Sequence, residues 1–126
     1  MLSLTTYKVV HLLGIFLTLC GIGGLWVLAV TSSPTADRSP RRLLLATHGI
    51  ALLLVLVGGF GMLARLGITG AWPLWIWIKM AVWLALAALP VLLRRSAARA
   101  QPLYYLAPIL AAIAAWAAIF HIGSGS

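Results

Sequence analysis

Four long apolar segments constrain this chain more than any other feature. They cover about 5–30, 43–65, 73–93 and 102–121. Because an α-helix rises about 1.5 Å per residue, each segment is long enough to cross the ~30 Å hydrocarbon core of a bilayer. Of the 126 residues, 63% are hydrophobic and 8% are charged, which is atypical of a soluble domain. The sequence therefore predicts an all-α integral membrane protein, an antiparallel four-helix transmembrane bundle built from one domain, 1–122.

Short stretches of polar and turn-forming residues separate the apolar segments. Loops are predicted at 31–42, TSSPTADRSPRR, and at 94–101, RRSAARAQ, with a shorter turn at 66–71, LGITGA. Residues 123–126, GSGS, are predicted to be a flexible tail that need not be native. The first apolar segment has a competing interpretation as a cleavable signal peptide, although it is longer than a usual signal sequence.

The positive charge of the chain is concentrated in two of the loops. Nine Lys and Arg residues stand against one acidic residue, which gives a net charge of +8. The two loops carry Arg38, Arg41 and Arg42 in one and Arg94, Arg95 and Arg99 in the other. Alternating spans place both loops on one side, and the positive-inside rule makes that side cytoplasmic, with both termini outside. We therefore expect the partners of these charges to be anionic lipid headgroups of the bilayer and no nucleic acid.

One lysine, Lys79, interrupts the third apolar segment. A charge at the centre of a bilayer costs about 2.5–3.5 kcal/mol on insertion scales, so an ionisable residue there is first interpreted as functional. The competing interpretation is that the side chain reaches along its apolar stem to the membrane surface. Trp75 and Trp83, four residues before and after Lys79, offer ring faces for a cation–π contact.

The three histidines differ in their expected depth. The helical rise places His11 and Lys79 in the same half of the membrane, so a shared site is plausible. His48 falls in the other half, roughly 15 Å from His11 along the membrane normal. The structural alternatives are an interfacial position for His11 and for His121, and a hydrogen bond from His48 to a neighbouring helix.

A ligand-binding interpretation of His11 follows from the residues on its face. His11, Gly14, Thr18 and Gly21 recur every three or four residues and share one side of a helix. Neutral imidazole is a common axial ligand of haem iron, and a four-helix bundle can hold a flat macrocycle between facing helices. The sequence thus suggests His11 as a metal ligand to b-haem, with the small residues lying beside the porphyrin. The alternative is that these residues serve helix packing.

Other small residues are expected to support close helix packing. These are the three glycines Gly58, Gly59 and Gly61 of the second segment, and the alanine-rich surface of the fourth segment. Cys20, the single cysteine, is expected to be a buried packing residue.

Several kinds of active site are missing from the sequence. The apolar segments contain no acidic residue, the chain has no cysteine pair, and it lacks both a nucleotide-binding glycine loop and a Ser–His–Asp set. Ordinary hydrolysis and carboxylate-based proton relays are therefore disfavoured.

Two stretches of sequence resemble a known group of proteins. YKVVHLLGIF, which contains His11, and WIWIKMAVWL, which contains Lys79, are similar to the HemJ, SirB and CopD-like group of small four-helix bacterial membrane proteins, and the similarity spans most of the chain. In HemJ-type protoporphyrinogen oxidases, a first-helix His and a third-helix Lys form the functional pair and are associated with b-haem. The resemblance implies that His11 and Lys79 are catalytic and cofactor-binding residues in a bacterial inner membrane. The stretch around His48 looks like uncharacterised relatives, and His48 is a third candidate for binding the cofactor.

Two further classes of function remain open from the sequence. The chain could be a non-catalytic accessory subunit that packs against a larger respiratory, photosynthetic or transport complex, or against copies of itself. It could also be a small transporter or metal-handling protein. The scattered positions of Met62, Met80, Cys20 and the histidines weaken that interpretation.

Overall fold

The computed structural model describes residues 2–31, 35, 37–68, 70–95 and 100–120. The helices are α1 (Leu4–Thr31), α2 (Ser39–Arg65), α3 (Leu74–Arg95) and α4 (Ala100–Ile119). All four are long and apolar enough to cross a membrane, and no strand occurs within these described residues. The predicted all-α transmembrane four-helix bundle is confirmed.

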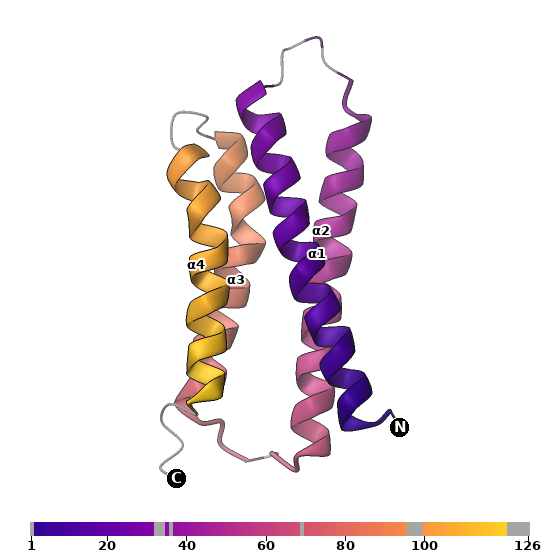
Figure 1. Ribbon diagram of the computed structural model, residues 1–126, viewed down its shortest axis with the longest axis vertical. Helices are drawn as coiled ribbons and strands as arrows, with labels where there is room; N and C mark the ends of the chain where they lie inside the picture. Colours follow the sequence, from indigo (N-terminus) through magenta and orange to yellow (C-terminus); the bar gives the residue numbers. More distant parts are fainter. Residues whose placement is uncertain (1, 32–34, 36, 69, 96–99, 121–126) are drawn as a thin grey trace.

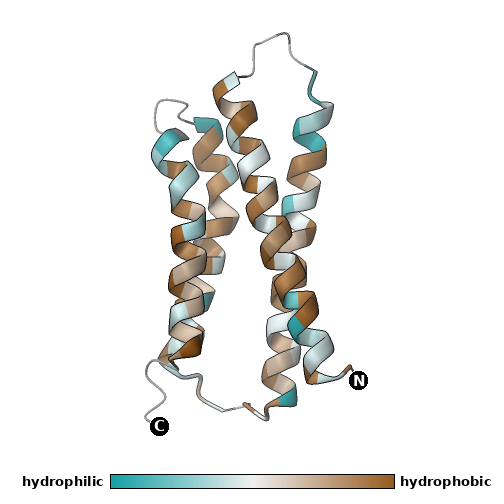
Figure 2. Ribbon diagram, in the orientation of Figure 1, coloured by the Kyte–Doolittle hydropathy of each residue, from teal (hydrophilic) through white to brown (hydrophobic). Residues whose placement is uncertain are grey.

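Consecutive helices run in opposite directions, so the bundle has two chemically different ends (Figure 1). We call one of them the basic end, where α1 and α3 end and α2 and α4 begin, because its arginines are Arg38, Arg41, Arg42, Arg94 and Arg95. At the other end, the terminal end, α1 begins and α4 ends. Figure 2 shows apolar residues along the full length of the four helices, as a lipid environment requires.

The helices extend further into the basic loops than the sequence predicts. α2 begins at Ser39, four residues before the expected Leu43. Pro40 occupies the first turn, where its missing N–H costs no hydrogen bond. The Ser39 amide donates to Asp37 Oδ1 at 3.0 Å, and this hydrogen bond holds the pKa of the Asp37 carboxyl below its ordinary value.

The other helix boundaries lie close to their predicted positions. α1 and the start of α3 fall within one residue of expectation. α3 continues through Arg94 and Arg95, since arginine is a good helix former and its charge is favourable in a last turn. α4 likewise begins at Ala100, two residues early. Arg99, His121 and the predicted tail 123–126 lie outside the described residues.

Glycines bring α1 and α2 into very close contact. A Cβ at Gly58 would lie 2.6 Å from the His11 backbone nitrogen, and one at Gly14 would lie 2.8 Å from the Ala51 carbonyl oxygen. A Cβ at Gly61 would overlap the ring of Tyr7. The predicted packing role is thereby confirmed for Gly58 and Gly61. The small face of α1 also serves packing, because Gly14 is covered by α2 and cannot lie beside a porphyrin.

Two clusters of buried hydrophobic residues lie in the half of the bundle nearest the basic end. Ile22 of α1, Leu89 of α3 and Ala107 of α4 form one cluster, and Leu25 and Leu93 form a second beside it. These contacts join the α1–α2 pair to the α3–α4 pair. Towards the terminal end the two pairs enclose a cavity instead.

Two expectations about small side chains are corrected by the packing. Cys20 is exposed on the outer surface of α1, because the buried face of this helix is taken by the glycines and His11. The alanine surface of α4 is tightly packed only in part. Ala107 and Ala117 are fully buried, whereas a neighbouring group of alanines lines the cavity: Ala111, Ala112, Ala114, Ala115 and Ala118.

Candidate functional site

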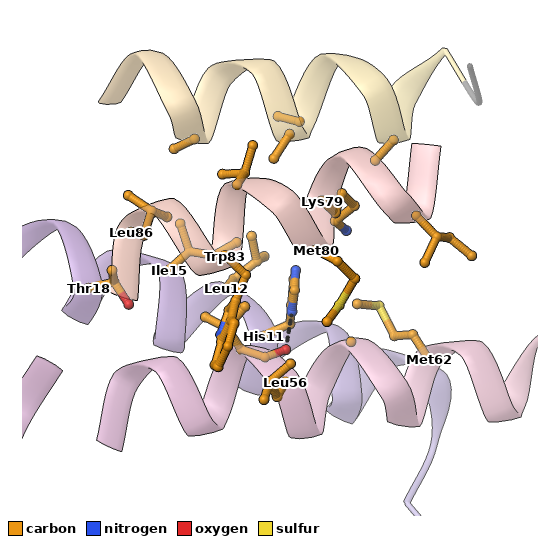
Figure 3. A pocket seen from close by; sticks show the side chains of 18 of the residues that line it. His11, Leu12, Ile15, Thr18, Leu56, Met62, Lys79, Met80, Trp83 and Leu86 are labelled. Carbon is orange, nitrogen blue, oxygen red and sulfur yellow. Dashed lines mark hydrogen bonds between the residues drawn. The ribbon is translucent and has the colours of Figure 1, made fainter. Parts of the chain in front are cut away.

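The cavity between the two helix pairs has a volume of about 760 Å³ and is lined by residues from all four helices (Figure 3). This volume lies within the roughly 300–1,000 Å³ of small-molecule and cofactor sites. The lining is mostly aliphatic and aromatic, and its few polar side chains include Lys8, His11, Thr18 and Lys79. The cavity is therefore shaped for an apolar ligand with a few specific polar contacts.

His11 is held in one orientation by the backbone of α2. Its Nδ1 lies 2.8 Å from the Val55 carbonyl oxygen, and its side chain is 8% exposed. Because a carbonyl can only accept a hydrogen bond, Nδ1 carries the proton, and the neutral ring keeps a lone pair on Nε2. Figure 3 shows the second ring nitrogen of His11 pointing across the cavity towards α3. A histidine that ligates a metal is typically fixed through its other nitrogen in this way.

Two adjacent glycines of α2 make room for His11. Gly58 admits the α1 backbone at His11, as described above, and a Cβ at Gly59 would lie 3.5 Å from the imidazole. Together with the Val55 carbonyl, they set both the position and the tilt of the ring. The sequence signalled the glycines as packing residues, but the choice of Val55 as hydrogen-bond acceptor carries no sequence signal.

Lys79 projects into the same cavity from α3, in line with one of its two sequence interpretations. Its Nζ lies 5.8 Å from the centroid of the Trp75 ring, within range of a cation–π contact. Trp83, the other ring considered for this contact, donates its indole N–H to the Leu52 carbonyl at 3.1 Å and ties α3 to α2. In Figure 3 the Lys79 amine points towards His11. The described helices contain no acidic side chain that could pair with this amine.

His48 lies outside the cavity, in the half near the basic end. Its position can be read from the glycines, since His11 faces Gly58 and His48 faces Gly21. The two contacts are ten residues apart on each helix (11 to 21 and 48 to 58), or about 15 Å at the helical rise. Because His48 does not line the cavity and both of its ring nitrogens are buried, it does not share a site with His11 in this structure.

The expected hydrogen bond from His48 to a neighbouring helix is not formed. The side chain is 4% exposed, and neither ring nitrogen has a hydrogen-bond partner among the residues that the structure describes. Pro90 has no N–H to donate to the Leu86 carbonyl four residues earlier. That carbonyl interacts with the His48 ring electrostatically but does not reach hydrogen-bond geometry. His48 is thus a buried polar group that has an electrostatic interaction but no hydrogen bond within the described residues.

The ligand set limits which metals the protein can hold. In the described part of the chain, no group of three or more His, Cys, Asp or Glu side chains gathers around a point. A metal bound at His11 would therefore need its other ligands from a bound molecule and not from these side chains. A metalloporphyrin does so, and the single oriented imidazole of His11 fits an axial position.

Comparison with known proteins does not assign the chain to a family. No family model matches it, and neither the curated proteins nor the solved structures contain a significant match.

Proposed function

We propose that the protein binds b-haem or a related porphyrin in the cavity, with His11 as the axial ligand. The observation that carries this proposal is the hydrogen bond of His11 Nδ1 to the Val55 carbonyl, which leaves Nε2 available on the cavity side. The apolar lining and the volume of about 760 Å³ also support it. When bound, b-haem supplies an iron centre for one-electron chemistry, which a protein adjusts through axial ligand and dielectric.

The resemblance to HemJ-type proteins suggests the reaction class, a porphyrinogen oxidation in which His11 and Lys79 act together. Lys79 shares the cavity with His11 and presents an amine that can bind an acidic group or take up a proton. His48 is left out of this site because it does not line the cavity. The function proposed here therefore rests on two of the three sequence candidates.

We place the protein in a bacterial inner membrane with the basic end in the cytoplasm and both termini outside. The arginines at one end of the bundle support this orientation through the positive-inside rule. Reporter fusions at Ser39 should report the cytoplasm, and fusions at Ile68 and Ser126 should report the outside. Finding Ser126 in the cytoplasm would reverse the assignment.

The haem proposal is tested by an absorption spectrum of the protein purified in mild detergent. We expect a Soret band, and b-type bands after reduction, that are lost or strongly weakened in His11→Ala. His48→Ala is the matched control, since it removes a second buried histidine from the same pair of helices. Its spectrum should match that of the unmodified protein.

Other outcomes of the same experiment would contradict the proposal. A colourless preparation that also fails to take up added haem would favour the accessory-subunit alternative. Equal loss of the bands in the two histidine variants would show that His11 is not the specific ligand. The elution volume in size-exclusion chromatography checks that each variant remains folded.

A further inference from the structure

Two lysines line the cavity from opposite sides. Lys8 belongs to α1 and lies three residues before His11, one helical turn closer to the terminal end. Lys79 belongs to α3, and Figure 3 shows its amine displaced from His11 in the same direction. Both positive charges thus lie on the terminal side of the candidate axial ligand.

Among the residues that the structure describes, no acidic side chain neutralises these lysines. The lining contains no Asp or Glu, and Asp37, the single acidic residue, precedes α2 at the basic end. The contact of Lys79 with Trp75 compensates an ammonium only in part. A cation that is partly buried in a low-dielectric site, as Lys79 is, is costly unless it is paired and hydrogen-bonded. The exposed Lys8 adds a second positive charge to the lining, so binding of an anion here is favoured.

The remainder of the lining determines what kind of anion can enter. Beyond the lysines, His11 and Thr18, the cavity walls are mainly aliphatic and aromatic, with Leu52, Trp83 and Leu86 at the deep part. A small inorganic anion would leave this apolar volume unfilled. The walls instead suit a large apolar body whose acidic groups remain near the terminal end.

From these observations we propose that the cavity binds a dicarboxylic amphiphile, with one carboxylate directed to Lys79 and one to Lys8. This inference rests on the proposed function, in which the apolar body is the porphyrin ring and the carboxylates are its acidic side chains. It adds the requirement that the ligand be a free diacid. A neutral ester of the same ring should bind poorly.

Titration of the purified full-length protein with haem b and with haem b dimethyl ester tests this proposal. Soret absorbance reports the binding of either ligand, and no variant is needed for the first comparison. A hydrogen bond to a charged group contributes enough that haem should bind at least about tenfold more tightly than its ester. Lys79→Met and Lys8→Gln should each reduce this preference, and the double variant should abolish it. Arg65→Gln is the control, because Arg65 is also a cation at the terminal end but does not line the cavity.

Each alternative outcome has a distinct meaning. If both ligands bind equally to the unmodified protein, the diacid inference is wrong and the haem site stands. If neither ligand binds, the proposed function fails and this inference fails with it. A preference that survives in the double lysine variant, or that falls equally in Arg65→Gln, would place the carboxylates elsewhere and overturn the assignment to Lys8 and Lys79.

Discussion

His11 and His48 are both buried between α1 and α2, but their surroundings differ in every respect that matters for chemistry. His11 has one nitrogen fixed by the Val55 carbonyl and the other facing a cavity. His48 has neither nitrogen hydrogen-bonded within the described chain, and no part of it lines the cavity. Burial alone therefore does not identify a ligand. The informative features are an anchored nitrogen and an open side.

The same contrast extends to the two halves of the bundle. Near the basic end, clusters such as Ile22 with Leu89 fill the space between the helix pairs. Near the terminal end, that space is the cavity. The packed half holds the α1–α2 pair against the α3–α4 pair. The two pairs can therefore stay separated around the cavity while the four helices remain one bundle. A binding site in a small membrane protein can thus be built by filling only one half of its core.

The largest change in stability is expected from adding a methyl group beside His11, compared with the same addition beside His48. In Gly58→Ala the new Cβ would lie 2.6–2.7 Å from the His11 backbone, so α1 and α2 must separate. Overpacking of this kind costs about 1–3 kcal/mol of unfolding free energy. The matched variant, Gly21→Ala, places a methyl group 3.8 Å from His48, an ordinary contact. It should gain up to about 1 kcal/mol from helix propensity.

Unfolding of both glycine variants in mixed detergent, followed by circular dichroism, measures the difference. Gly58→Ala should also weaken any haem spectrum, because the His11 ring moves with its backbone. If the two variants were equally stable, the tight contact at His11 and the relaxed contact at His48 would not differ in energy, and the contrast between the two sites would lose its structural basis.

A smaller effect of opposite sign is expected at His48. His48→Leu replaces an imidazole that has no hydrogen bond by an apolar side chain. Removal of a buried polar group that lacks a hydrogen bond should raise the unfolding free energy by about 1 kcal/mol. The same detergent unfolding assay applies, and the haem spectrum should not change. A clear loss of stability would mean that the His48 nitrogens are satisfied in the membrane, and the two histidines would then be more alike than the packing indicates.

The fold could be predicted because hydropathy and length alone decide membrane spans. The depth of polar groups was also accessible, since the helical rise orders His11, Lys79 and His48 along the membrane normal. The sequence does not predict which face of each helix points into the bundle. The face with His11 and Gly14 packs against α2, and Cys20 points outwards. A sequence with apolar residues all round each helix gives no amphipathic signal for these choices.

The parts of the site that were missed depend on contacts between helices. Val55 orients His11 through a backbone carbonyl, a group that every residue possesses. The missing hydrogen bond at His48 depends on how its ring is placed relative to the Leu86 carbonyl of α3, a contact between two helices. The cavity exists because alanines of α4 do not reach across to α2, which involves residues about 50 positions apart in the sequence.

The contacts that orient His11 also bear on the order in which the protein is made. Val55, Gly58 and Gly59 all belong to α2, so the first helical hairpin contains every group that fixes the imidazole. Ribosomes deliver this hairpin to the membrane before α3, and membrane helices associate after they are inserted. The nascent chain can therefore present an oriented His11 imidazole before Lys79 has been translated. In biogenesis, the second hairpin then completes the cavity around an imidazole whose orientation is already set.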